Sequence, residues 1–256
     1  MKTILITGSK GFVGKHLVKV LSFDTRYSVY EYTRQSTLKE LDAIIDGVDF
    51  IFHLAGEVNP KSAAEAFFEK NVTLSQVLID VLKSRGLKIP ILLSSSIHAE
   101  NPKNVYGTTK KESEEIILLY GLEQKVPVYI YRLFHLFGEG CKPNYNSVIS
   151  TWMYNVIRDL EIQVYDRSIA MHYSYVQDVI NEFIAHLDRS NTSSSFFQSS
   201  VVYDTTLGEV VDDINEFKHN IHNPAYRIED NPFKQKLFIT YQDYYQQFIH
   251  ESKELQ

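Results

Sequence analysis

Tyr106 and Lys110 are the residues of this sequence whose types and spacing best suit acid–base chemistry. The apolar residues after them recur at helical spacing, so we expect a helix that presents both side chains on one face. An ammonium beside a phenol favours the phenolate and lowers the pKa of the phenol, which makes a tyrosine an effective proton donor or acceptor near neutral pH. Alone, the pair is weak evidence, because helices often carry it by chance.

Three hydroxyl side chains, Ser94 to Ser96, lie upstream of this pair. They follow the apolar run Ile91–Leu93, which is typical of a buried parallel strand. Hydroxyls at the carboxyl end of such a strand open onto the crevice in which parallel sheets bind their ligands. The serine-tipped strand therefore strengthens the interpretation of Tyr106 and Lys110 as reactive groups.

A glycine-rich turn near the N-terminus predicts what is bound beside them. Gly8, Gly11 and Gly14 follow the apolar run Ile4–Ile6 and precede a stretch of helical periodicity. Residues without a Cβ let the backbone approach a pyrophosphate, which then lies at the positive N-terminus of the helix. An ordinary tight turn is the alternative, but the strand–glycine–helix context favours a dinucleotide site.

The end of the second predicted strand, Tyr27–Thr33, bears on the choice of dinucleotide. An acid about twenty residues after the glycines is typical of NAD sites. Here Arg34 stands at that distance from Gly14, and Lys10 lies inside the glycine loop. Two cations suit a ribose 2′-phosphate, so the sequence favours NADP. Glu31, which we place inside the strand, is the competing acid and keeps NAD as the alternative.

A third apolar run, Phe50–Leu54, predicts another strand, and its small closing residues Ala55 and Gly56 let the chain pass close to a cofactor. His53 in this run is interpreted as a packed or strand-end histidine rather than a base. A long helical pattern follows at Ala63–Arg85. Asn71 within it is either solvated or bonded to the main chain near the active site.

The C-terminal part of the sequence predicts several helices and strands but no further reactive residues. We expect a helix that begins with the capping box Thr206–Glu209. Further helices and strands follow from periodicity and composition, and residues 190–195 read as a polar loop. The other predicted elements are helices at Ser147–Leu160 and from Tyr241 onward, and short strands at Ile162–Asp166 and Val201–Tyr203.

Composition narrows the class of protein. The 256 residues carry a net charge of −6 and a pI near 5.9, which gives no reason to expect nucleic acid or an anionic membrane as a partner. The single cysteine, Cys141, excludes an internal disulfide and leaves no cysteine cluster for a metal, so no metal is expected. We expect no signal peptide and a reducing cytoplasm as the compartment.

Together, Gly8–Gly14, Ser94–Ser96 and Tyr106–Lys110 resemble the extended short-chain dehydrogenase/reductase superfamily, in its NAD-dependent epimerase/dehydratase branch. The resemblance implies an α/β fold, a Rossmann doubly wound parallel sheet with a small C-terminal substrate-binding region. It also implies a catalytic triad of Ser96, Tyr106 and Lys110, with Ser95 as the alternative hydroxyl. The cofactor-binding residues that we predict are Gly8, Lys10, Gly11, Phe12, Val13, Gly14, Arg34, Leu54, Ala55, Gly56, Asn71, Ser94, Tyr106 and Lys110.

Within that branch, four segments are similar to the reductase domain of enzymes of capsular polysaccharide synthesis that also carry a metal-binding cupin domain. These segments are Ser94–Ile97, Val128–Arg132, Cys141–Ile149 and Glu161–Arg167. The similarity implies NADPH-dependent reduction of the 4-keto group of a UDP-linked 6-deoxy-amino sugar. It also implies substrate binding by Ser96, His135, Lys142, Asn144 and Asn146.

Two departures from that pattern stand out. The sequence printed here contains no cupin domain, so we expect any epimerisation to be absent or to fall to a separate cupin-type protein. His135 stands where the family usually has asparagine, so we expect the local cofactor or substrate contacts to differ from those of the family.

Other readings stay open. An epimerase that retains its cofactor would use the same triad. A protein that senses NADP without turnover would not need the triad. The oligomeric state is also open, with a homodimer as one possibility. The domains that we predict are an NADP-binding domain at 1–165 with a return segment at 172–188, and a substrate-binding region at 189–256.

Overall fold

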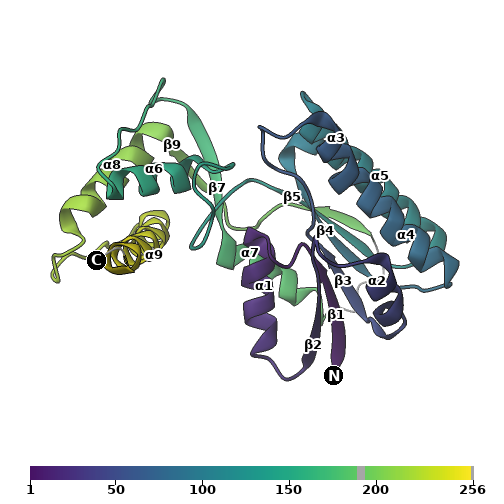
Figure 1. The fold of residues 1–256 in the computed structure, drawn as a ribbon. Helices are drawn as coiled ribbons and strands as arrows, with labels where there is room; N and C mark the ends of the chain where they lie inside the picture. The colour runs from purple at the N-terminus through teal and green to yellow at the C-terminus, as the bar shows by residue number, and fades with distance from the viewer. Residues whose placement is uncertain (189–193, 255–256) are drawn as a thin grey trace. The chain divides into compact units, whose positions relative to one another are not determined.

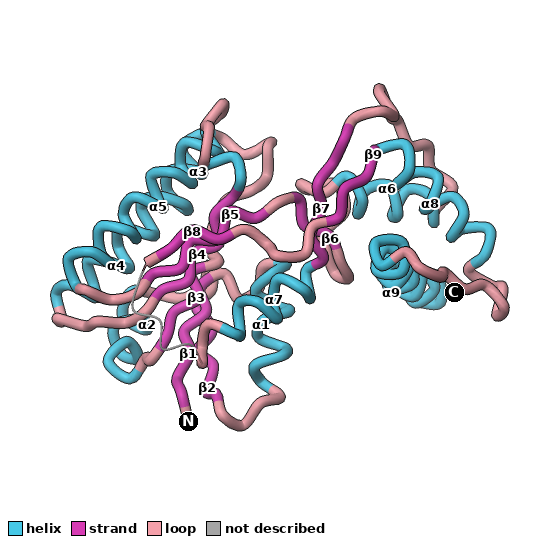
Figure 2. Tube along the Cα trace, turned by 180° about the vertical axis from the view of Figure 1, so that it is seen from behind, coloured by secondary structure: helices cyan, strands magenta, loops and turns pink. Residues whose placement is uncertain are grey.

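The computed structural model describes residues 1–188 and 194–254, which form two compact units (Figures 1 and 2). The first unit comprises Met1–Leu133 and Val179–Ser199, and the second comprises Phe134–Asp178 and Ser200–Gln256. The predicted domains divide the chain elsewhere, because they place residues 134–165 with the first unit. The roles predicted for those domains stay predictions.

The first unit contains a six-stranded parallel sheet in the order β2-β1-β3-β4-β5-β8. The chain runs from β1 outward to β2 and then crosses to β3 on the other side of β1, so the sheet is doubly wound, as predicted. This reversal brings the carboxyl ends of β1 and β3 together, where such sheets bind ligands. The strands are β1 Lys2–Thr7, β2 Tyr27–Tyr32, β3 Phe50–His53, β4 Ile91–Ser96, β5 Val128–Leu133 and β8 Ser195–Phe197.

Helices cover both faces of this sheet (Figures 1 and 2). Alternate strand residues such as Leu5 and Leu93 pack against Leu78 and Tyr120 on one face. On the other face, Phe52 stacks on Phe183 with ring centroids 6.1 Å apart. The first face carries α2 Leu38–Ile44, α3 Ala64–Phe67, α4 Leu74–Ser84 and α5 Val105–Gln124; the second carries α1 Phe12–Ser22 and the part of α7 (Val176–Ala185) from Val179 onward. Short 3₁₀ turns lie at Ile45–Gly47 and Ile97–Ala99.

The helix predicted at Ala63–Arg85 forms with one irregularity. A π-helical segment, Phe68–Thr73, joins α3 to α4. Asn71 lies within it and is buried. Segments of this kind are frequently found at functional sites, because the extra residue per turn turns one side chain out of the regular helical register.

The second unit is built on a three-stranded sheet in the order β6-β7-β9, in which β6 and β7 are parallel and β9 is antiparallel. Its core includes Phe137, Trp152, Phe217 and Tyr241. The strands are β6 His135–Phe137, β7 Ala170–Tyr175 and β9 Tyr203–Thr206, and the helices are α6 Val148–Ile157, α8 Leu207–Asn220 and α9 Pro232–Glu254. The capping box predicted at Thr206 and Glu209 is present at the start of α8.

Three expectations for this half of the chain need correction or remain open. Ile162–Asp166 is not a strand, because Ile162 and Val164 instead pack as partly buried side chains against the core of the second unit. The strand expected at Val201–Tyr203 begins only at Tyr203. Most of the polar loop predicted at 190–195 lies outside the described residues.

Two kinds of structure are absent from residues 1–188 and 194–254. No helix there is both long and apolar enough to cross a lipid bilayer. In the same part of the chain, no group of three or more histidine, cysteine, aspartate or glutamate side chains is arranged to hold a metal ion.

Candidate active site

The glycine loop between β1 and α1 packs tightly against the end of β3. Gly8 has a φ of +70°, and a Cβ there would lie 2.7 Å from the backbone of Ala55. A Cβ on Gly14 would lie 2.2 Å from the carbonyl oxygen of Gly8. Neither position accepts a side chain, so the backbone alone forms this surface.

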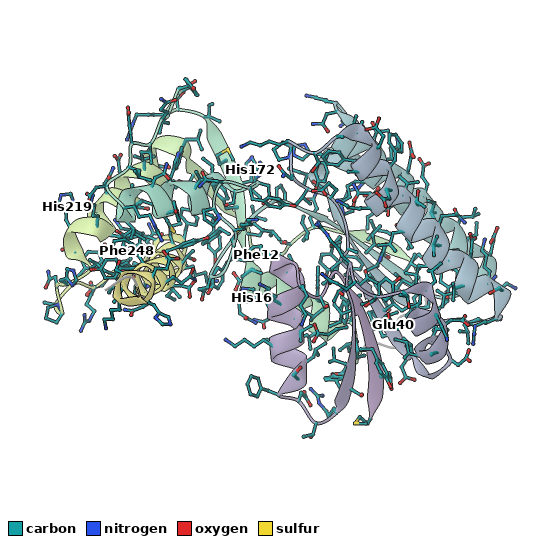
Figure 3. All side chains as sticks on the ribbon, viewed as in Figure 1. Phe12, His16, Glu40, His172, His219 and Phe248 are labelled. Carbon is teal, nitrogen blue, oxygen red and sulfur yellow. The ribbon has the colours of Figure 1, made fainter. Side chains whose placement is uncertain are left out.

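The N-terminus of α1 follows this loop directly. Gly11 occupies the N-cap and offers no side-chain hydrogen bond, and the first turn holds no acidic residue. Phe12 begins the helix, and its ring contacts His16 edge-on at 5.5 Å (Figure 3). Helix N-terminal amides without a capping side chain suit an anion such as a pyrophosphate. The loop and the helix start therefore fit the dinucleotide that the sequence predicts.

Both cations assigned to a 2′-phosphate have acidic partners. Lys10 pairs with Glu31 at 2.9 Å, and the hydrogen bond from Lys10 lowers the pKa of that carboxyl. Arg34 lies 3.9 Å from the carboxylate of Glu57, which is 2% exposed and pairs with Lys70 at 2.6 Å. Glu31 lies inside β2, as predicted.

Asn71 joins the segment after β3 to α5. Its Oδ1 accepts a hydrogen bond from the amide of Glu57 at 2.8 Å, and its Nδ2 donates to Oγ1 of Thr109 at 3.0 Å. Gly56 lies against the side chains of Asn71 and Lys110. Of the two roles that the sequence left open for Asn71, the bond to the main chain near the predicted site is the one present.

Tyr106 and Lys110 lie in the first two turns of α5. The helix begins at Val105 because Asn104 caps it, accepting from the amide of Gly107 at 2.9 Å. The ammonium of Lys110 is buried and donates to the carbonyl oxygen of Ser94 at 2.9 Å. Ser96, at the end of β4, hydrogen-bonds to Tyr106. One helix and one strand end thus bring the three predicted triad residues together.

Burial shifts the pKa values of these two groups in opposite directions. It raises the pKa of Tyr106, and the hydrogen bond with Ser96 opposes that shift. It lowers the pKa of Lys110 to about 8, against the attraction of Glu114. The sequence led us to expect a lowered pKa for Tyr106. The direction differs because burial disfavours the phenolate, while the ammonium of Lys110 bonds to a backbone carbonyl.

Ser95 and Ser96 were alternative candidates for the third hydroxyl. Successive residues of a strand point to opposite sides of the sheet. Ser95 donates to Glu114, whereas Ser96 bonds to Tyr106 and also accepts from the amide of His98. The hydroxyl beside the phenol is therefore that of Ser96.

His53 links three elements inside the first unit. Its Nδ1 is 2.7 Å from Oγ1 of Thr7 on β1, and its Nε2 is 2.9 Å from Oγ of Ser75 on α4. Ser75 continues to Ser113 on α5 at 2.7 Å. Burial, reinforced by the charge of Lys110, lowers the pKa of His53 to about 3. This geometry is that of a packed, neutral histidine, as interpreted from the sequence.

Three charged residues near the site were missed by sequence reasoning: Glu57, Glu114 and Arg132. Glu114 had a detectable signal, because it stands one further helical repeat beyond Tyr106 and Lys110. Glu57 and Arg132 gave none, since their partners lie far away in the sequence.

The predicted substrate residues His135, Lys142, Asn144 and Asn146 all belong to the second unit. His135 begins β6, with its ring 6.0 Å from that of Tyr173. The other three are exposed in the loop before α6. In this loop Lys142 lies over the ring of Tyr145, and the backbone N–H of Asn144 donates to Oγ1 of Thr151. Their approach to the triad stays a prediction.

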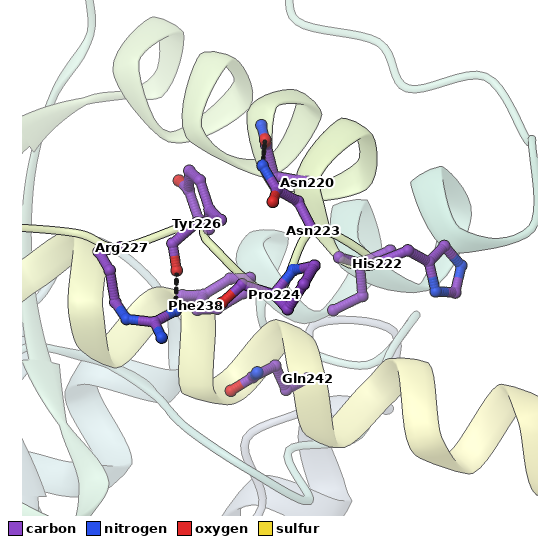
Figure 4. A pocket seen from close by; sticks show the side chains of 9 residues that line it. Asn220, His222, Asn223, Pro224, Tyr226, Arg227, Phe238 and Gln242 are labelled. Atoms are coloured by element: carbon purple, nitrogen blue, oxygen red, sulfur yellow. Dashed lines mark hydrogen bonds between the residues drawn. The ribbon is translucent and has the colours of Figure 1, made fainter.

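A surface pocket of about 350 Å³ in the second unit lies elsewhere on the chain (Figure 4). It is lined by residues of the segment from Asn220 to Arg227, together with Phe238 and Gln242 of α9. None of the predicted site residues is among them.

The geometry has counterparts among known proteins. The chain is 35% identical over 238 residues to the UDP-2-acetamido-2,6-beta-L-arabino-hexul-4-ose reductase of Pseudomonas aeruginosa. The aligned residues cover 93% of this chain and 63% of that protein. The capsular polysaccharide assembling protein CapF from Staphylococcus aureus superposes with a TM-score of 0.82 and 39% identity, over 94% of this chain and 65% of that one. The chain thus spans less than two thirds of the length of either relative.

More distant matches agree with the fold. A UDP-glucose 4-epimerase from Thermotoga maritima superposes with a TM-score of 0.80 at 17% identity, over 96% of this chain and 99% of that one. The model of the NAD dependent epimerase/dehydratase family matches residues 4–196, which include the glycine loop and the whole predicted triad. The chain belongs to the NAD dependent epimerase/dehydratase family.

Proposed function

We propose that this chain is an NADPH-dependent reductase of the 4-keto group of a nucleotide-linked 6-deoxy or 6-deoxy-amino sugar in surface polysaccharide biosynthesis. The observation that carries the proposal is the grouping of Ser96, Tyr106 and buried Lys110 in the unit that holds the glycine loop. The relatives support the substrate class, since one is named a hexul-4-ose reductase and the other a capsular polysaccharide assembling protein.

The chain's own groups account for the proton. Bound NADPH would supply the hydride to the ketone carbon. Tyr106 donates its proton to the oxygen that becomes the alcohol, and its raised pKa keeps the hydroxyl protonated until then. Ser96 orients the carbonyl oxygen. Lys110 is predominantly cationic at neutral pH, because its pKa is about 8, and it stabilises the phenolate left after transfer.

The glycine loop and the start of α1 would hold the pyrophosphate, and Leu54 to Gly56 would line the path of the cofactor at the end of β3. Lys10 and Arg34 favour NADPH over NADH. Each would exchange its present carboxylate for a 2′-phosphate, which carries more charge. Glu31, with Lys10 removed, would favour the ribose hydroxyls of NAD instead.

In the second unit, Lys142, Asn144 and Asn146 are proposed to bind the diphosphate or sugar, and His135 the sugar. A homodimer, a separate cupin-type epimerase and a cytoplasmic setting complete the proposal.

The direct test is an assay of the purified chain with a panel of UDP- and dTDP-linked 4-keto-6-deoxy sugars, following NADPH oxidation. We expect consumption of NADPH in equal amount to sugar reduced with at least one UDP-linked member. No oxidation with any member, from protein that binds NADPH, would contradict the proposal.

The second candidate is a sugar-nucleotide epimerase or dehydratase with retained NAD. The family model and the epimerase fold favour it, because the same triad moves a hydride and a proton at one carbon in either reaction. A protein that binds NADP without turnover is less well supported, since it has no use for Tyr106 and Lys110 together.

A further inference from the structure

A buried carboxylate lies behind the proposed reactive lysine. Tyr106, Lys110 and Glu114 follow one another at four-residue intervals on α5, so they share one face of the helix. Glu114 is 2% exposed. Its Oε1 accepts from Oγ of Ser95 at 2.5 Å and from Nε of Arg132 at 3.0 Å, and its Oε2 accepts from the other arm of the guanidinium at 2.7 Å.

This carboxylate joins three elements at the end of the sheet. Ser95 belongs to β4, the strand whose carbonyl oxygen at Ser94 holds Lys110. Arg132 belongs to β5 and also lies over the ring of Phe196 at 4.4 Å. A buried ion pair of this kind is poor evidence for stability, because desolvation opposes the attraction. The ion pair lies beside the triad, where it can act on the proposed reaction rather than on stability.

Among the charged and titratable groups packed around Lys110, Glu114 is the carboxylate whose attraction favours the ammonium form. His53 of β3 is neutral at neutral pH, because its pKa is about 3, and Tyr106 is neutral because burial raises its pKa. The groups that face this region of the described chain are Tyr106 and Glu114 of α5, His53 of β3 and Arg132 of β5. Two further carboxylates there have cationic partners: Glu100 pairs with Arg132 at 3.8 Å, and the buried Glu57 pairs with Lys70 at 2.6 Å.

We propose that Glu114 is a positioning residue for the reaction, which keeps the buried Lys110 in its cationic form and ties α5 to the serine-bearing end of β4. This inference rests on the proposed function, since it assigns a partner to the lysine of that site. The attraction of Glu114 opposes the loss of the proton from Lys110, in the direction that the proposal requires.

The test compares Glu114→Gln with two matched variants. Glu115→Gln removes an exposed carboxylate one residue further along α5, with the same change of net charge. Arg132→Gln breaks the same ion pair but leaves the carboxylate of Glu114 in place. Each protein is labelled with ¹³C at the lysine Cε, and Lys110 is titrated by NMR, with Lys110→Arg identifying its signal.

We expect Glu114→Gln to lower the pKa of Lys110 below the wild-type value of about 8, and the other two variants not to lower it. A purely structural role predicts that Glu114→Gln and Arg132→Gln act alike, and that outcome would overturn the proposal. An unchanged pKa in a folded Glu114→Gln protein would do so as well.

Turnover gives a second readout. The basic limb of the pH profile of kcat/KM should move to lower pH in Glu114→Gln, with Glu114→Asp restoring it toward wild type. Equal loss of activity at all pH values would contradict the proposal. The NMR titration needs no substrate, so a failure of the proposed function would leave this part of the test intact.

Discussion

Burial shifts the pKa values of the proposed acid, Tyr106, and of the neighbouring Lys110 in opposite directions. It keeps the hydroxyl of Tyr106 protonated and makes the ammonium of Lys110 easier to deprotonate, with a pKa of about 8. At neutral pH both groups are therefore in the forms that proton donation to an alkoxide needs. Helical spacing was enough to predict that these two side chains share a face. The sign of the shift at Tyr106 was not predictable, because it depends on how the rest of the chain covers the phenol.

At this scale we expect Tyr106→Phe to abolish turnover and leave NADPH binding nearly unchanged. The hydroxyl is the proposed proton source, whereas the ring and its neighbours Phe67 and His98 keep their packing. Single-turnover rates and cofactor titration by fluorescence measure the two effects. Rates within about tenfold of wild type, a barrier change of roughly 1.4 kcal/mol, would exclude Tyr106 as the acid.

A second residue-scale prediction concerns the cofactor. Arg34→Ala should reduce the ratio of the NADH to the NADPH dissociation constant, because it removes a cation proposed to face the 2′-phosphate. Arg26→Ala is the control, since Arg26 is an exposed cation just before the other end of β2, paired with Asp24. If the ratio is the same in both variants, the argument from Arg34 is wrong and Glu31 becomes the residue to test.

At the scale of elements, the site depends on how closely β1, β3 and α5 approach one another. The glycine spacing predicted that the loop contacts a ligand. The structure adds that the loop also packs against Ala55 at the end of β3. The chain of hydrogen bonds from Thr7 through His53 and Ser75 to Ser113 was not predictable. It joins residues from four elements whose pairing only the folded sheet defines.

Gly14→Ala is expected to weaken NADPH binding by more than tenfold and to lower the melting temperature, because its methyl group would overlap the carbonyl oxygen of Gly8. Gly47→Ala provides the comparison, since a Cβ there meets no atom within 4 Å. Isothermal titration and thermal unfolding of both variants report the effect. Equal behaviour of the two would show that the loop is not as tightly held as its geometry requires.

The histidine network predicts how stability depends on pH. The folded pKa of His53, about 3, is below its ordinary value of 6.5, so the unfolded chain binds more protons between these values and the fold is destabilised as pH falls. Between pH 7 and 5 this contribution is about 2 kcal/mol. His53→Gln should remove it.

Hydrogen-exchange protection factors of the β1 and β3 amides measure this loss, since Trp152 lies in the second unit and would not report on the first. His219→Gln, which replaces an exposed histidine of α8, is the control. A wild-type protein and a His53→Gln protein with the same loss of protection between these pH values would refute the assignment.

At the scale of the whole molecule, the parallel sheet could be predicted in part, because β1, β3 and β4 are apolar runs that end at glycine, small or serine residues. The strands β5 and β8 were not predicted from the sequence. The division into two units could not be predicted. Residues 134–165 follow β5 without a break in composition, and only the folded chain places Phe134–Asp178 with the C-terminal helices. The missed assignment at Ile162–Asp166 has the same origin, because alternation of apolar residues does not show whether a partner strand exists.

The reductase and the epimerase differ in what the whole protein does with its cofactor. A reductase exchanges the cofactor in every cycle, so moderate affinity suits it, whereas an epimerase must retain it through two half-reactions. We expect the protein to purify largely free of cofactor and to oxidise NADPH stoichiometrically with a 4-keto sugar nucleotide. Bound NAD after purification, with interconversion of sugar nucleotides in the absence of added cofactor, would establish the epimerase instead.

The discontinuity of the first unit also bears on how the protein is made. After Leu133 has left the ribosome, β5 is the outermost strand, and the segment that covers its edge, Ser195–Phe197, has not been synthesised. At about 5–20 residues per second, the delay is on the order of several seconds. An uncovered strand edge invites pairing with other chains. The nascent polypeptide therefore passes through an interval in which chaperone protection of Tyr129 to Tyr131 would matter most.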